Sequence, residues 1–213
     1  MANISEDMGG TTDIDLDGIP IELTLDQKNR NTFGFGAFVE YWVSPMFAFQ
    51  FNFIYNMKGV KVSGDFDEDI VYQGVFMNVK GNFDEVIKLS YFSFPILAKL
   101  SFGQSGTIQP HIIFGPEMGI LLTAKDANSG EVTGSAQGFS TSQSFSDESD
   151  IKDGTESTEF AINFGAGLTI PLGNIDMFID GMYGLGLTNI IKDSDQSVKN
   201  NVIYINAGLI FGR

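Results

Sequence analysis

The most suggestive chemical motif of the sequence is Asp-Ile-Asp-Leu-Asp-Gly at residues 13–18. This Asp-x-Asp-x-Asp-Gly spacing opens the calcium loop of EF-hand proteins, in which carboxylate oxygens ligate the ion. Position 12 of such a loop needs a bidentate Glu, but Thr24 stands there, and no helical pattern flanks the run. The sequence therefore favours an acidic surface loop. Weak binding of a divalent cation by Asp13, Asp15 and Asp17 is the alternative, and we expect no other cofactor.

A second candidate centre is His111, the only histidine of the chain. A histidine beside a Ser and an acid could serve a lipid-modifying membrane enzyme as a general base. The acid that shares its strand face is Glu117, six residues on. At about 3.3 Å per residue the two lie some 20 Å apart, too far for contact. We therefore expect His111 to be an interior polar residue and the protein not to be an enzyme.

Composition excludes several classes of protein. The chain has 213 residues, a formal charge of −15, 20 Phe, 25 Gly and no Cys. The acidity argues against nucleic-acid binding, and the absence of Cys excludes disulfides and thiolate metal sites. No apolar run approaches the roughly 18–20 residues of a transmembrane helix. We recognise no signal peptide within the first residues and expect the protein to be either intracellular or shown without its leader. We expect a single domain over residues 1–213.

The dominant pattern is alternation with period two, which predicts strands with one apolar face. From Phe47 to Met57 every second residue is aromatic or Met, and the intervening residues include Gln50, Asn52 and Asn56. The same alternation recurs at residues 33–43, 107–125, 158–171, 174–188 and 200–211. In residues 86–102 the apolar phase flips near Phe92, which predicts a β-bulge.

The composition of the two strand faces indicates which one points inward. The Phe-rich faces carry no charge and no amide, whereas the opposite faces combine charges with many glycines, as a crowded small-barrel interior requires. A soluble monomer rarely exposes so large an apolar area, so we expect lipid around the Phe-rich faces. With Lys88 and Glu159 also counted as inward-facing, the interior charge is about −1. The expected interior polar network is Glu40, Lys58, Lys99, His111, Glu117, Lys125, Asp176 and Asp180.

Connector lengths predict the topology. Short turns at Ser44-Pro45, 103–106 and 171–174 alternate with longer segments, which is the pattern of outer-membrane barrels with periplasmic turns. The longer segments, 6–32, 59–85, 126–157 and 189–200, are expected to be extracellular loops, of which 126–157 is flexible and the best place for partner recognition. Seven spans are visible, and such barrels have an even number of strands. We therefore predict an all-β, eight-stranded antiparallel up-and-down transmembrane β-barrel whose first strand is truncated.

Four motifs, in their order along the chain, resemble motifs of the PorT-like outer-membrane β-barrel family of Bacteroidetes-type bacteria. The resemblance rests on Tyr-Phe-Ser-Phe-Pro-Ile-Leu-Ala-Lys at 91–99, Pro-His-Ile-Ile-Phe-Gly-Pro at 110–116, Phe-Gly-Ala-Gly at 164–167 and Tyr-Gly-Leu-Gly-Leu-Thr-Asn-Ile at 183–190. Residues 2–5 resemble the end of the family's first strand, but Gly212 and Arg213 follow the aromatic residue on which such barrels end. The resemblance implies an eight-stranded barrel in the bacterial outer membrane, and it implies no catalytic residue.

The main functional hypothesis is an integral outer-membrane protein with a structural or surface-interaction role, a plugged polar interior and acidic loops. Eight strands leave an interior just filled by side chains, so a conducting pore is the minority interpretation. The expected partners are outer-membrane lipid and envelope or secretion proteins that contact the loops. Two alternatives stay open, a soluble lipocalin-like binding barrel with an apolar interior and a lipid-modifying outer-membrane enzyme.

Overall fold

The computed structural model describes residues 2–4, 10–16, 19–72, 74–104, 106–192 and 198–211, which form one antiparallel sheet of eleven strands. The strands are β1 (Ala2–Ile4), β2 (Gly10–Leu16), β3 (Ile19–Asn29), β4 (Gly34–Trp42), β5 (Phe47–Tyr72), β6 (Val75–Ser101), β7 (Gln109–Ala136), β8 (Phe139–Asp150), β9 (Thr158–Pro171), β10 (Ile175–Gly186) and β11 (Asn200–Phe211). A short 3-10 helix spans Lys152–Gly154. Within the described ranges no helix is long and apolar enough to cross a membrane.

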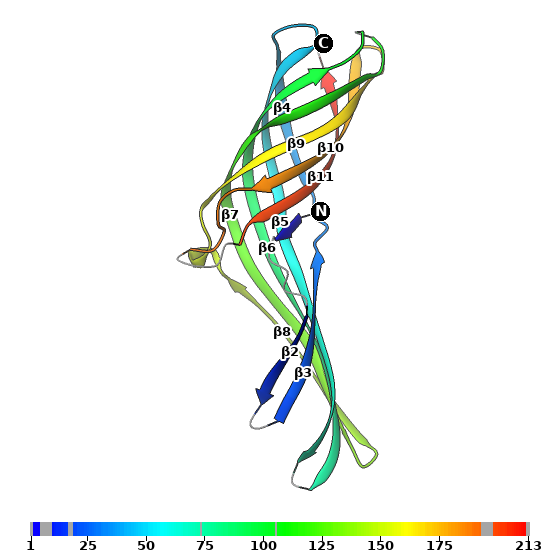
Figure 1. Cartoon of the computed structure of the whole chain (residues 1–213), viewed down its shortest axis with the longest axis vertical. Helices are drawn as coiled ribbons and strands as arrows, with labels where there is room; N and C mark the ends of the chain where they lie inside the picture. The colour runs from blue at the N-terminus through cyan, green and yellow to red at the C-terminus, as the bar shows by residue number, and fades with distance from the viewer. Residues whose placement is uncertain are drawn as a thin grey trace.

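The sheet has two parts (Figure 1). One part, the wall, runs β1-β11-β10-β9-β7-β6-β5 through hydrogen-bonded neighbours, and β4 also pairs with β5. The second part, which we call the extension, consists of the distal halves of β5, β6 and β7 with β3, β2 and β8 added at the two sides. Figure 1 shows the wall curling round at one end of the molecule and the extension projecting from it as a long twisted sheet.

The prediction of eight strands is wrong for the sheet as a whole, and the sheet is not closed. Strands β2, β3 and β8 pair with the extension and have no counterpart in the sequence-based count. Among the described residues, β1 pairs only with β11 and β4 pairs only with β5, so no hydrogen bonds join β1 to β4. Residues 2–4 do form the expected strand, and it pairs with residues 200–202 of β11.

The long connectors are largely strands, which corrects the expectation of loops at 6–32, 59–85 and 126–157. Cross-strand pairing continues between β5 and β6 to Tyr72 and Val75, and between β7 and β8 to Ala136 and Phe139. Polar and acidic composition suggested loops, but such residues also suit a sheet face in water. Residues 189–200 contain no strand before Asn200, and residues 193–197 lie outside the described ranges. The three short turns are confirmed, since β4–β5, β6–β7 and β9–β10 are joined by them.

Glycines opposite aromatic residues hold the extension together. Gly64 pairs with Phe83, and the Phe83 ring covers the position that a Gly64 Cβ would occupy. Gly81 and Phe66 form a second pair of this kind between the same two strands, and the Phe66 ring covers the position of a Gly81 Cβ. An aromatic ring laid over a cross-strand glycine supplies the apolar contact that the glycine lacks. The extension is therefore a regular sheet stabilised by cross-strand pairs.

The predicted β-bulge exists, but its extra residue lies on the other strand. The register between β6 and β7 shifts between Ser90 and Tyr91, and Leu122 of β7 has no partner. Strand β6 keeps its alternation throughout, so Leu89 and Tyr91 are both buried and point inward with Leu97. The apparent phase flip near Phe92 therefore arises because the interior changes from polar to apolar along β6.

The orientation of the Phe-rich faces of the wall is as expected. Phe-rich positions are exposed on the wall, and they include Phe51, Phe53, Phe114, Phe160 and Phe164. Charged and amide side chains are buried inside it. A lipocalin-like barrel needs an apolar interior and a polar exterior, so the soluble-barrel alternative is wrong.

Candidate functional site: the polar interior of the wall

A buried lysine and two buried glutamates form the centre of the interior. Lys58 projects from β5, Glu117 from β7 and Glu159 from β9. The Lys58 ammonium donates to Glu117 Oε1 at 3.3 Å and also to Glu159 Oε1. The Lys58 side chain is 1% exposed. Because an isolated buried charge is very unfavourable, these three groups depend on one another.

Amide and aromatic side chains complete this centre. Asn163 Nδ2 donates to Glu117 Oε2 at 2.7 Å, and Asn200 Nδ2 donates to Glu159 Oε2 at 2.6 Å. The Lys58 Nζ atom lies 5.2 Å from the centroid of the Tyr91 ring, a cation–π distance. The centre thus joins five strands, β5, β6, β7, β9 and β11, through polar contacts.

His111 belongs to a second interior group, in which its acidic partner is Asp180 and not Glu117. His111 Nε2 lies 2.8 Å from Asp180 Oδ1 on β10, and Thr169 Oγ1 of β9 lies 3.4 Å from His111 Nδ1. Gly167 of β9 makes room for the pair, since a Cβ there would be 2.8 Å from His111 Nε2. His111, Asp180 and Thr169 are all buried. The group has the residue types of a catalytic triad, and all three side chains lie inside the wall.

A third interior pair lies on the short-turn side of β4 and β6. Lys99 Nζ donates to Glu40 Oε1 at 2.7 Å, and both side chains are almost fully buried. The indole nitrogen of Trp42 donates to Glu40 Oε2 at 3.2 Å. Both charges of the pair are therefore partnered inside the wall.

The structure brings together most of the predicted interior residues and excludes others. Glu40, Lys58, Lys99, His111, Glu117 and Asp180 are interior. The prediction that Lys125 faces the interior is wrong, because its side chain is exposed and its Nζ atom pairs with Glu148 Oε1 at 2.6 Å. Lys88 likewise faces outward and pairs with Glu148 at 2.7 Å. Alternation predicted that both lysines face inward. It does not reveal that Leu122 is an extra residue in β7, nor where along the strands the outer apolar belt ends.

Some interior residues were not in the predicted network. Glu159 alternates inward in the sequence and carries a central ion pair, yet the predicted network omits it. Tyr91, Asn163 and Asn200 carry no signal that marks them as partners of charges, because partnership depends on strands far apart in the chain. Asp176 is half-buried.

An apolar cluster covers the interior where the wall meets the extension. It comprises Val60, Leu89, Tyr91, Leu121, Ala124, Ile190 and Val198, with Ile87 and Ile151 packed against it. Residues of three wall strands and of two connecting segments contribute to this cluster. It separates the polar interior from the extension side of the molecule.

The aspartate motif falls on a strand. Asp13 and Asp15 lie in β2, paired with Glu22 and Pro20 of β3, and Asp17 lies outside the described residues. The backbone is thus a β-hairpin strand, not the expected surface loop. The cation site stays a prediction. Among the described side chains, no group of three or more His, Cys, Asp or Glu is placed to hold a metal ion.

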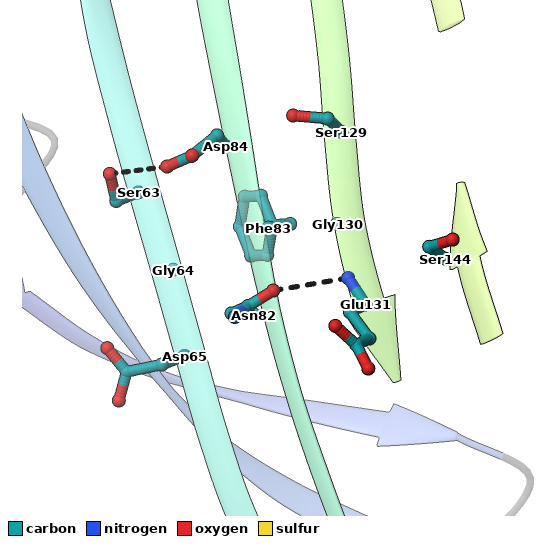
Figure 2. Close-up of a pocket in the computed structure, with 10 residues that line it drawn as sticks. All are labelled: Ser63, Gly64, Asp65, Asn82, Phe83, Asp84, Ser129, Gly130, Glu131 and Ser144. Carbon is teal, nitrogen blue, oxygen red and sulfur yellow. Dashed lines mark hydrogen bonds between the residues drawn. The ribbon is translucent and has the colours of Figure 1, made fainter. Parts of the chain in front are cut away.

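A shallow hollow of about 360 Å³ lies on the extension (Figure 2). Its rim carries Ser63, Asp65, Asn82, Asp84 and Glu131. Ser63 Oγ donates to Asp84 at 2.7 Å, and the Glu131 amide donates to Asn82 at 3.1 Å, as Figure 2 shows. Hydrogen bonds from Lys61 and Ser63 hold the pKa of Asp84 below its ordinary value. The hollow is open and polar, so it is a weaker candidate site than the interior.

An apolar outer belt around a charged interior, built from antiparallel strands, defines the class of outer-membrane β-barrel proteins. The chain matches the family model of the outer membrane protein beta-barrel domain over residues 9–192. It belongs to this family and is an outer-membrane β-barrel protein. No curated protein and no solved structure matches the chain.

Proposed function

We propose that this protein is a plugged barrel whose role is surface interaction and not conduction. The observation that carries the proposal is the buried Lys58–Glu117–Glu159 centre, which joins side chains from three strands of the wall, β5, β7 and β9. The buried His111–Asp180 and Lys99–Glu40 pairs support the same proposal, because they place further partnered charges inside the wall. A small barrel has an interior just wide enough for such side chains.

The extension is the part of the protein available to partners. Strands β5, β6 and β7 have 26, 27 and 28 residues, whereas a tilted strand crosses a bilayer in about 9–11. The outward apolar belt ends near Lys61, Lys88 and Lys125, so the residues beyond them lie in water. The short turns lie at the opposite end, which supports an extracellular extension and periplasmic turns.

The expected partners are proteins of the cell envelope, including secretion proteins. The PorT-like motifs at 91–99 and 110–116 support this assignment by resemblance alone. The family association with secretion is an analogy at the level of fold, so it guides the choice of partners and not the chemistry.

The proposal is tested by folding and conductance measured together. We expect the chain, refolded in detergent, to migrate as a compact species until boiled and to give no steady conductance in planar bilayers. Lys58→Ala should open transient conductance, because it removes the link between β5 and two other strands. A wild-type protein with steady ion channels would contradict the plugged interior, and one soluble without detergent would contradict the barrel.

The enzyme alternative has a test of its own. We propose that His111 has a structural role, because its partners Asp180 and Thr169 are buried with it. Expression of His111→Ala in place of the wild type should leave the outer-membrane lipid composition unchanged. A change in lipid acylation that follows loss of His111 would show an enzymatic role.

A further inference from the structure

One face of the extension is apolar, and apart from β1, which contacts β3 and β5, no described element packs across it. The register continues the inward face of β5, β6 and β7 into the extension, where we call it the inner face. Each described strand of the extension contacts chiefly its hydrogen-bonded neighbours in the sheet. The inner face carries these apolar residues with described side chains: Leu23, Leu25, Val62, Phe66, Ile70, Met77, Val79, Phe83, Val132, Phe139 and Phe145.

The opposite face of the extension is polar and has charges of both signs. Lys61 pairs with Asp84 at 2.9 Å, and Lys80 pairs with Asp67 at 2.7 Å. A sheet with water on both sides needs two polar faces. One polar face is enough only when another molecule or element covers the opposite face. The contrast between the two faces therefore indicates that the inner face meets another molecule.

Charge on the inner face identifies the chemistry of that molecule. Among the described side chains the inner face carries four acids, Glu68, Glu85, Asp126 and Asp147, and no Lys or Arg. Asp126 Oδ1 is buried without a hydrogen-bond partner. Burial and the neighbouring Asp126 carboxylate both raise the pKa of Glu85. Two acids thus repel each other at the base of an apolar surface where no cation offsets them.

We propose that the inner face of the extension binds a cationic amphipathic polypeptide segment, whose apolar side chains cover Phe66 and Phe83 and whose Lys or Arg side chains pair with Glu85 and Asp126. The inference deepens the proposed surface-interaction role and rests on it. Anionic lipid headgroups have the wrong charge for this surface. An apolar ligand without charge would leave both carboxylates without a cation, although Asp126 Oδ2 accepts a hydrogen bond from Asn128 Nδ2 at 3.2 Å.

The test uses the full chain in phosphatidylcholine nanodiscs, with empty nanodiscs as the background. The probes are a fluorescent 14-residue Leu/Lys amphipathic peptide and a Leu/Glu peptide of the same length. Binding is measured by fluorescence polarisation. The variant is Glu85→Gln/Asp126→Asn. The matched control is Asp84→Asn/Glu131→Gln, which removes the same charge from the same two strands on the opposite face.

We expect the Leu/Lys peptide to bind the wild type and the control alike, and to bind the inner-face variant about tenfold more weakly. The Leu/Glu peptide should not bind. Equal weakening by both double variants would show attraction to the net charge of −15 and would overturn the proposal. Absence of Leu/Lys binding to the wild type would also overturn it. Heat-modifiable migration of each variant separates these outcomes from failure of the barrel itself.

Discussion

At the scale of single residues, the interior is defined by charges that are stable only in combination. Lys58 neutralises one of two glutamates, and amides from Asn163 and Asn200 satisfy the remaining carboxylate oxygens. Removing one partner of a buried ion pair leaves an uncompensated charge, whereas replacing the whole set with apolar residues can be neutral. We therefore expect the centre to contribute more to the choice of which strands pair than to the net free energy of unfolding.

Replacement of Lys58 tests this dependence. Lys58→Met should lower the free energy of unfolding by about 3–5 kcal/mol, because Glu117 and Glu159 lose their cation. The measurement is urea unfolding in lipid vesicles, followed by the fluorescence of Trp42, the only tryptophan. Lys61→Met is the control, because the Lys61–Asp84 pair is partly exposed and should matter by less than about 1 kcal/mol. Addition of Glu117→Gln and Glu159→Gln to Lys58→Met should recover much of the loss.

Gly167 tests the space around the histidine. Gly167→Ala places a Cβ against His111 and Asp180, so it should lower the free energy of unfolding by about 1–3 kcal/mol. Gly181→Ala on the neighbouring strand meets nothing within 4 Å and is the matched control. The nuclear magnetic resonance chemical shifts of the His111 ring should change in Gly167→Ala and not in Gly181→Ala. Equal stabilities would show that the interior can rearrange around the methyl group.

At the scale of elements, the extension combines long hairpins with a polar edge. All twelve residues of β8 are exposed, and most of them are Ser or acidic. A charged, polar edge strand discourages pairing with another sheet. Strand β8 is held to β7 by antiparallel pairing along its whole length. In addition, the Glu148 carboxylate of β8 pairs with Lys88 Nζ at 2.7 Å and with Lys125 Nζ at 2.6 Å.

Acid should loosen the attachment of β8. Hydrogen bonds from Lys125 and Lys88 lower the pKa of Glu148 to about 2. Because the pKa is depressed in the folded state, the stabilisation is complete above the ordinary Glu value near 4.5 and is lost as the pH falls through about 2. Amide hydrogen exchange in β8, corrected for intrinsic rates, should therefore become less protected between pH 5 and about 2. In Glu148→Gln this part of the pH dependence should disappear, and its persistence would exclude Glu148 as the cause.

At the scale of the whole molecule, similar exposed apolar residues lie in two different solvents. Phe114 on the wall is 57% exposed and Val71 at the end of the extension is 58% exposed. The wall residue belongs to the lipid-facing belt, whereas Val71 lies beyond it on the extension, which we propose to lie in water. Solvent, and not exposure, should decide what a charge costs at each place.

A lysine scan at these two positions measures that difference. Phe114→Lys should destabilise the protein in phospholipid vesicles by about 2–4 kcal/mol, the cost of a Lys near the bilayer midplane. Val71→Lys should change the free energy of unfolding by no more than about 0.5 kcal/mol. Both are measured by urea titration of Trp42 fluorescence. Equal effects would mean that the belt around Phe114 does not face lipid.

The sequence by itself determined the all-β class, the direction of most strand faces and most of the interior charges. Alternation with period two is local, so Phe114 and Glu117 could be assigned to opposite faces from their spacing alone. The bulge was predicted from the phase change near Phe92, but that change reflects the nature of the interior along β6, and the extra residue itself is Leu122 on β7.

Only the tertiary structure decided which charges meet and where the sheet ends. His111 pairs with Asp180 and not with Glu117, because neighbours across strands are set by register and not by distance along the chain. The strands in residues 59–85 and 126–157 were missed, because acidic and Ser-rich residues are typical of loops and equally of a sheet face in water. Closure likewise depends on strand edges that are far apart in sequence, and no local pattern reports on their pairing.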